Sequence, residues 1–265
     1  MQAIWQELIR LGERGEPAAL CTIVKTQGST PGKQAMKMLV RADGSILGTV
    51  GGGCLEAEVL EAALEAMRDD RPTTLAFALN ERDYPDSGLV CGGRLEIYVE
   101  PIVEPRLFIF GGGHVAEALT RIATLVGFHV TVADDRPAFA SPERHPEAAA
   151  TLAGPWDAAV EAALDAGPGG LAQRYLVVAT RGHQDDEDIL RGLADGLAGG
   201  SGEAPRYLGM IGSRAKRVTI FKNLAAAGVP EAFLDTVRTP MGLDIGARTH
   251  EEIAVSVVAE LIQLR

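Results

Sequence analysis

The second half of the chain alternates short apolar runs with helical patterns, and this alternation restricts the fold more than any other feature. The runs are RLFIF (106–110), FHVTVA (128–133), YLVVA (175–179) and RYLGMI (206–211). Each is followed by polar or glycine-rich residues, and most then by a helical stripe, of which the first is Val115, Leu119, Ile122 and Val126. Strands that alternate with helices pack as a parallel sheet with helices on both faces. The sequence therefore predicts a doubly wound α/β unit.

A glycine-rich turn follows the first apolar run and matches a Rossmann-like fingerprint. Gly111, Gly113 and Ala116 fit G-x-G-x-x-A between a strand and a helix, and Asp134 ends the next strand. In such units the glycines let backbone N–H groups approach a diphosphate at a helix N-terminus, and the acidic residue accepts hydrogen bonds from sugar hydroxyls. We therefore predict a phosphate-bearing ligand here. The alternative is that the glycines only permit a tight turn and close helix packing. The predicted binding residues are Gly111, Gly112, Gly113, His114 and Asp134.

Further polar loops follow the later strands and should meet the glycine turn at one edge of the sheet. In IGSR, Ser213 can cap a helix whose first turn is basic, so an anion would relieve the conflict between those charges and the helix dipole. We predict that Gly212, Ser213 and Arg214 contact the ligand. The alternative is a solvated basic face, which applies more to Lys216 and Arg217 than to Arg214. The TRGHQDD loop leaves two interpretations open, a metal site or a histidine beside a helix-capping aspartate. Its candidate residues are His183, Asp185 and Asp186.

The first 101 residues have a different order of predicted helices and strands, which indicates a smaller α+β domain. The patterns indicate a helix through residue 12, a helix over 54–68 with an apolar stripe, and several strands. The stripe is Leu60, Ala63, Leu64 and Met67, and the strands are ALCTIV, MKMLV, 74–79 and 94–99, with a hairpin turn at Asp43–Gly44. The prolines of EPIVEP (100–105) are predicted to break any continuing element. We therefore place the domains at 1–101 and 102–265.

A second glycine trio, in GTVGGGCLEAEV (48–59), departs from the dinucleotide fingerprint because Glu56 occupies the third position. It offers instead Cys54 at the start of a helix, where the dipole lowers a thiol pKa and favours the thiolate. Cys91 also lies beside glycines, in VCGGR, on the same domain. We predict that Cys54 and Cys91 have chemical roles and act together. The alternative is that both are small buried hydrophobes.

Composition excludes several classes of function. The chain has 25 Lys and Arg against 36 Asp and Glu, a net charge of -11, which argues against a general affinity for nucleic acid or anionic lipid. No apolar run approaches the roughly 20 residues that span a bilayer, and the start has no signal-peptide layout, so the expected location is cytoplasmic. Three dispersed cysteines predict reduced thiols and no disulfide framework.

Distinctive motifs occur in succession along nearly the whole chain. They are GSTP (28–31), GTVGGGCLEAEV, VCGGRLEIYVEP (90–101), FGGGHVAEAL (110–119), VADDRP (132–137), TRGHQDDE (180–187), YLGMIGSRAKR (207–217) and MGLDIGARTHEEIAVSVVAEL (241–261). With these motifs the chain resembles the XdhC/CoxI family of xanthine dehydrogenase accessory proteins. The resemblance implies a maturation factor that binds molybdenum cofactor (molybdopterin), protects it while its sulfido ligand is installed, and delivers it to a molybdenum hydroxylase apoenzyme. A cysteine desulfurase and a homo-oligomer are further implied partners.

The chemistry of the cofactor suits both glycine trios. Its phosphate, sometimes extended to a dinucleotide, suits the turn at Gly111–Gly113, and its molybdenum suits soft thiolates such as Cys54 and Cys91. An NAD(P)-dependent oxidoreductase is the alternative, because G-x-G-x-x-A with a strand-ending Asp134 also binds those nucleotides. Because Arg136 follows Asp134 closely, the choice between NAD and NADP stays open. The sequence has no Tyr-x-x-x-Lys pair that could serve as the acid-base pair for hydride transfer. A third alternative is an interaction protein with a vestigial nucleotide fold.

Overall fold

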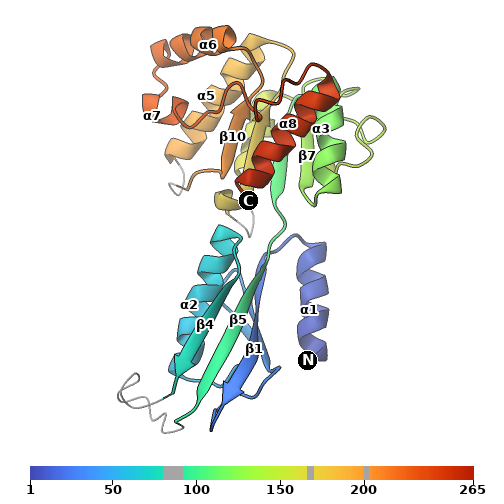
Figure 1. Cartoon of the computed structure of the whole chain (residues 1–265). Coiled ribbons are helices and arrows are strands. Elements are labelled where there is room, and N and C mark those ends of the chain that lie inside the picture. Colours follow the sequence, from blue (N-terminus) through green and yellow to red (C-terminus); the bar gives the residue numbers. More distant parts are fainter. Residues whose placement is uncertain (80–91, 166–169, 200–202) are drawn as a thin grey trace. The chain divides into compact units, whose positions relative to one another are not determined.

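The computed structural model describes residues 1–79, 92–165, 170–199 and 203–265. The chain divides into two compact units, Met1–Glu104 and Pro105–Arg265, each of which is described by itself (Figure 1). Among the described residues, no helix has the length and apolar character that crossing a membrane requires.

The N-terminal unit is an antiparallel sheet with one helix on each face. Its strands run in the order β3-β2-β1-β5-β4. Alternate residues of β1 point to opposite faces, so Ala19 and Cys21 pack with α2 while Ala18 and Leu20 pack with α1. The elements are α1 (Gln2–Glu13), β1 (Ala18–Gln27), β2 (Lys37–Arg41), β3 (Ile46–Gly48), α2 (Cys54–Asp69), β4 (Thr73–Ala78) and β5 (Arg94–Ile102).

Two details of this unit differ from the sequence prediction. The buried face of α2 includes Leu55 and Val59, whereas Leu60 and Leu64 lie half-buried at its flank. Strand β5 also continues through Pro101, which was predicted to break it. Because β4 pairs with β5 only as far as Val99, the missing N–H of Pro101 costs no ladder hydrogen bond on that side.

The C-terminal unit confirms the predicted doubly wound parallel sheet, in the order β10-β9-β6-β7-β8. Strand order reverses between β6 and β9, which is where such sheets bind ligands. Helices α3 and α8 cover one face, and α4, α5 and α6 cover the other. The elements are β6 (Arg106–Phe110), α3 (His114–Leu125), β7 (His129–Asp134), β8 (Ala150–Ala153), α4 (Trp156–Leu164), η2 (Leu171–Gln173), β9 (Arg174–Val178), α5 (His183–Gly199), β10 (Tyr207–Met210), α6 (Arg214–Ala226), α7 (Glu231–Leu234) and α8 (His250–Gln263).

Helix α3 buries small residues more completely than the large ones of its predicted stripe. Ala116 and Ala123 are fully buried beside Leu119, whereas Val115 and Ile122 are half-buried. Small side chains let a helix backbone approach the sheet and the neighbouring helix closely, and α3 packs against α8 in this way. The predicted stripe was therefore displaced, although the helix itself was correctly placed.

A buried carboxylate ties α8 to the segment that precedes it. Glu260 accepts hydrogen bonds from Tyr207 Oη at 2.7 Å, Arg238 Nη1 at 3.0 Å and the backbone N–H of Gly242 at 2.7 Å. Burial, and then the hydrogen bond to Glu260, raise the pKa of Tyr207 far above its usual value. Ser256 adds a hydrogen bond from its Oγ to the carbonyl of Leu243. The path from β10 to the start of α8 is thus fixed by polar contacts.

We predict that Glu260→Ala lowers the free energy of unfolding by about 2–4 kcal/mol, because it leaves the buried Tyr207 hydroxyl and the Gly242 N–H without their acceptor. Urea unfolding followed by circular dichroism measures this. Gln263→Ala on the exposed face of the same helix is the control and should change stability by less than about 0.5 kcal/mol. Equal stabilities of the two variants would contradict the role given to Glu260.

Candidate functional site

A cavity of about 250 Å³ lies at the carboxyl edge of the parallel sheet, where strand order reverses. The loops after β6, β7, β9 and β10 and the start of α8 all contribute to it. Its lining is Gly113, His114, Val115, Arg136, Phe139, Ala179, Thr180, Arg181, Ile211 and His250. A larger hollow of about 900 Å³ between α4 and α5 contains none of the residues predicted to bind a ligand, so the smaller cavity is the candidate site.

The three glycines of the turn after β6 serve different purposes. A side chain at Gly111 would collide with the carbonyl of Ala179, and one at Gly112 would collide with the carbonyl of Phe139. These two are glycines because the backbone packs closely, which is the packing alternative raised by the sequence. Around Gly113 there is open space, and it faces the cavity. Among the described residues no side chain caps α3, so its first N–H groups face this space without a capping acceptor.

Asp134 holds the glycine turn in place. Its side chain is 2% exposed, and it accepts hydrogen bonds from Gly112 N at 2.8 Å and from Arg136 N, Nε and Nη2 at 2.8–3.0 Å. Burial raises its pKa, but the hydrogen bonds from Arg136 and Gly112 outweigh this and hold the pKa at about 2. Both carboxylate oxygens are thus used within the protein, and a sugar hydroxyl would have to share them or displace Arg136.

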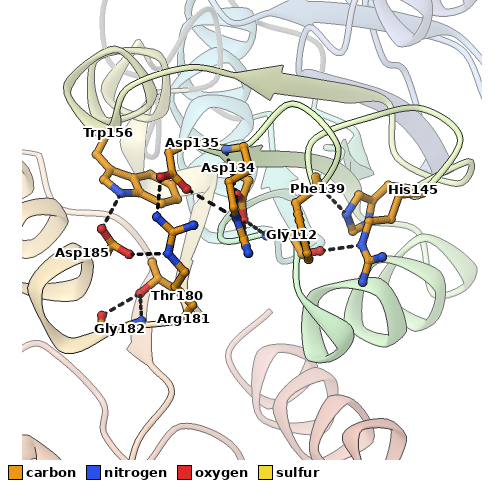
Figure 2. Close-up of polar contacts among 12 residues, drawn as sticks. Gly112, Asp134, Asp135, Phe139, His145, Trp156, Thr180, Arg181, Gly182 and Asp185 are labelled. Atoms are coloured by element: carbon orange, nitrogen blue, oxygen red, sulfur yellow. Dashed lines mark hydrogen bonds and ion pairs between the residues drawn. The ribbon is translucent and has the colours of Figure 1, made fainter.

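The segment after β7 covers the other side of Gly112. Two guanidinium groups contact the Phe139 ring, with Arg136 3.5 Å and Arg144 4.8 Å from the ring centroid. Arg144 Nε donates to Gly112 O at 2.8 Å, and the buried His145 ring contacts Phe139 O at 2.9 Å through Nε2 (Figure 2). Burial is the main reason that the pKa of His145 is lowered, which favours the neutral ring. These contacts hold Gly112 in place together with its hydrogen bond to Asp134.

A chain of polar contacts links the loops after β7 and β9. Arg181 donates from Nη2 to Asp135 Oδ2 at 2.7 Å and lies 3.6 Å from Asp185 Oδ2, and Asp185 accepts a hydrogen bond from Trp156 Nε1 at 3.1 Å (Figure 2). The figure shows Arg181 between the two aspartates. Within the parts of the chain that the structure describes, no three His, Cys, Asp or Glu residues are grouped as a metal site. The contacts of Asp185 are thus with Arg181 and Trp156.

The IGSR loop is placed beside the cavity, and of its four residues only Ile211 lines it. Ser213 Oγ accepts a hydrogen bond from Lys216 N at 3.2 Å, so it caps α6 as predicted. The Lys216 side chain covers Gly212 and pairs with the buried Asp186 at 2.5 Å. Burial is the main cause that raises the pKa of Asp186, while Lys216 acts in the opposite direction. Arg214, also predicted to bind the ligand, is exposed to solvent.

His250 is a site residue that the sequence did not identify. Its ring stacks on that of His114, with centroids 5.3 Å apart and planes at 17°. Each histidine is the first residue of its helix, α3 or α8, and both line the cavity. The capping box formed by Thr249 and Glu252 could have located this helix start. No local sequence pattern predicts that the start of α8 lies against the start of α3.

In the N-terminal unit, a carboxylate organises the other glycine trio. Glu56 Oε1 accepts hydrogen bonds from Thr49 Oγ1 at 2.5 Å, Val50 N at 3.1 Å and Gly52 N at 3.0 Å. The glycines 51–53 all have positive φ, a conformation that other residues rarely adopt. The residue that broke the dinucleotide fingerprint thus has a structural reason to be glutamate.

This loop presents Cys54 to solvent as the first residue of α2. The GSTP loop lies beside it, because Gly51 packs against Pro31. The same loop reaches the second cysteine motif, since Ser29 forms a β-bridge with Gly92. Cys91 itself lies outside the described residues. Cys21 is fully buried, and burial raises its pKa to about 12, as expected for a structural thiol.

Comparison with known proteins covers both units. Residues 107–261 match the XdhC Rossmann domain, and residues 11–78 match the XdhC and CoxI family. The chain is 35% identical to the uncharacterized protein YqeB of Escherichia coli strain K12 over 99% of its own length, but it spans only 46% of that protein. It is 26% identical to a protein of Bacillus subtilis strain 168 named as a probable xanthine dehydrogenase component, covering 96% of this chain and 94% of that protein.

A further relative is the molybdenum cofactor insertion chaperone PaoD of Escherichia coli strain K12, which is 25% identical over 95% of this chain and 84% of that protein. The family match to the second unit alone extends over more than half of the chain, and it coincides with the parallel sheet and its glycine turn. This protein therefore belongs to the XdhC and CoxI family.

Proposed function

We propose that this protein carries molybdenum cofactor as cargo, shields it while its terminal sulfido ligand is installed, and delivers it to a xanthine dehydrogenase-type molybdenum hydroxylase apoenzyme. The similarity to PaoD, named as a molybdenum cofactor insertion chaperone, supports this class of role. A cysteine desulfurase is the proposed source of the sulfur. The observation that carries the proposal is the open face of Gly113 in a cavity lined by arginines, at the start of α3, which no side chain of the described residues caps.

The phosphate end of the cofactor fits this cavity for electrostatic reasons. The start of α3 bears the positive end of a helix dipole and N–H groups that no side chain of the described residues caps. Arg136 and Arg181 line the same cavity and add positive charge beside it. Their aspartate partners offset part of that charge, so the helix N–H groups are the main proposed contacts and the arginines assist. His114 and His250 bound the cavity from the helix side.

The N-terminal unit, taken by itself, offers thiol chemistry that suits molybdenum. Cys54 is exposed on a loop whose shape Glu56 fixes, and a thiolate is a soft ligand for a metal such as molybdenum. Cys91 is proposed as its companion because both motifs belong to the same unit. Cys54 suits this proposed role because its sulfur is a soft donor and its side chain is exposed.

An NAD(P)-dependent oxidoreductase would use the same cavity. Rossmann-type enzymes of that class present the strand-ending carboxylate to a ribose, whereas here Arg136 and Gly112 already use both oxygens of Asp134. This favours a ligand that is held mainly by its phosphate. The ligand that the protein retains, and whether it turns over a nicotinamide cofactor, separate the two functions.

Gly113→Val is expected to fold normally and to bind molybdopterin at least about tenfold more weakly, because the new side chain would fill the space beside the α3 N–H groups. Isothermal titration of purified protein with molybdopterin under anaerobic conditions measures the change. Gly154→Val is the matched control, since Gly154 also has open space around it but lies outside the cavity lining. Unchanged affinity of the Gly113 variant would remove the cavity from the proposal.

Protein made in a host that synthesises molybdenum cofactor, and purified without oxygen, should carry molybdopterin, detectable as its fluorescent oxidation product. Replacing Cys54 and Cys91 together by Ser should reduce the molybdenum retained per pterin, because the soft ligands are lost while the phosphate contacts remain. Cys21→Ala serves as the thiol control, since Cys21 is fully buried. If the purified protein holds NAD(P) and no pterin, and if the variant without Cys54 and Cys91 still oxidises or reduces a nicotinamide cofactor, the protein is an oxidoreductase instead.

A further inference from the structure

The opposite edge of the parallel sheet carries a row of basic residues. Strands β6, β7 and β9 begin with Arg106, His129 and Arg174. The register pairs Arg106 directly with His129 on one side and with Arg174 on the other. Residues paired in this way project from the same face of a sheet, so the three basic side chains lie side by side at this edge.

A cavity of about 270 Å³ adjoins this row. It is bounded by the three basic residues, by the sheet residues Phe108 and Thr131, and by Asp165 just after α4. Its volume corresponds to several water molecules at about 30 Å³ each, which leaves room for a phosphate group. Parallel strands begin at one edge and end at the other, so this cavity is separate from the one beside Gly113.

Arg174 is a buried residue whose guanidinium group lacks part of its hydrogen bonding. It is only 7% exposed and lines the cavity. One guanidinium nitrogen, Nη2, donates to the carbonyl of Asp165, whereas the buried Nε has no hydrogen-bond partner among the described residues. Burial, and then the charge of Arg106, lower the pKa of Arg174. Buried cations in proteins are normally paired with anions, so Arg174 has an unmet need for one.

Asp165 is the acidic residue among those that line the cavity. Asp165 is exposed, and Arg174 contacts its backbone carbonyl. The end of α4 contributes about half a negative charge through its dipole. The guanidinium of Arg174 has a planar fork of donors that matches oxyanions, and Arg106 lies on the adjacent strand in direct register.

We infer that the cavity beside Arg106, His129 and Arg174 is a second anion site, which takes a phosphate-class oxyanion at the amino edge of the sheet. The bound oxyanion accepts a hydrogen bond from Arg174 Nε and offsets the repulsion between the two arginines. The site is independent of the molybdenum cofactor proposed for the opposite edge, and the phosphate group itself is the chemistry that it recognises.

The test follows the Nε–H resonance of Arg174 in ¹H–¹⁵N spectra of the full-length protein, using inorganic phosphate as the probe and chloride to hold ionic strength constant. The Nε–H resonance is assigned by through-bond correlation with the backbone resonances of Arg174. Its absence in the Arg174→Met variant checks the assignment. We expect it to shift saturably in the wild type, and Arg106→Gln to weaken the apparent affinity about tenfold or more.

Gly113→Val separates this site from the cavity at the other edge. The Arg174 resonance should shift in that variant as in the wild type, even if Gly113→Val abolishes binding of molybdopterin. Loss of the shift in Gly113→Val would assign the phosphate response to the other cavity and overturn the inference. An Arg174 resonance that does not move in the wild type would also overturn the inference. The wild-type titration decides the matter even if Arg174→Met fails to fold.

Discussion

The candidate site depends on the contact between the buried carboxylate of Asp134 and the backbone N–H of Gly112. This hydrogen bond joins the end of β7 to the turn after β6, and Arg136 completes the set of donors around the carboxylate. Gly111 and Gly112 are then packed against the carbonyls of Ala179 and Phe139. With those two positions fixed, Gly113 is left facing open space at the start of α3.

The same physical arrangement occurs in the N-terminal unit with different residues. Glu56 accepts hydrogen bonds from the backbone of Val50 and Gly52, and the loop that it holds ends at the exposed Cys54. A carboxylate that binds an N–H group of a glycine trio thus appears in both units. In one case the trio leads to a helix start that faces a cavity, and in the other it leads to a thiol.

Capping distinguishes the helix starts near the cavity from one another. Ser213 caps α6 and Thr249 caps α8, so their own side chains supply acceptors to the first turns. Among the described residues no side chain caps α3. An external acceptor, such as a phosphate oxygen, therefore gains more at α3 than at α6. This difference ranks Gly113 above Ser213 as a contact for the proposed ligand, although the sequence suggested both.

The sequence by itself determined the parallel sheet, the turn at Gly111–Gly113 and the helix start at Cys54, because these depend on local periodicity and on the backbone freedom of glycine. The tertiary structure alone decided that Gly112 and Arg136 occupy both oxygens of Asp134, where His250 lies, and how Lys216 pairs with Asp186. It also placed Arg106 beside Arg174 through the strand register. These contacts join residues that are distant in the chain, and no local pattern specifies which strands become neighbours or which helix starts meet.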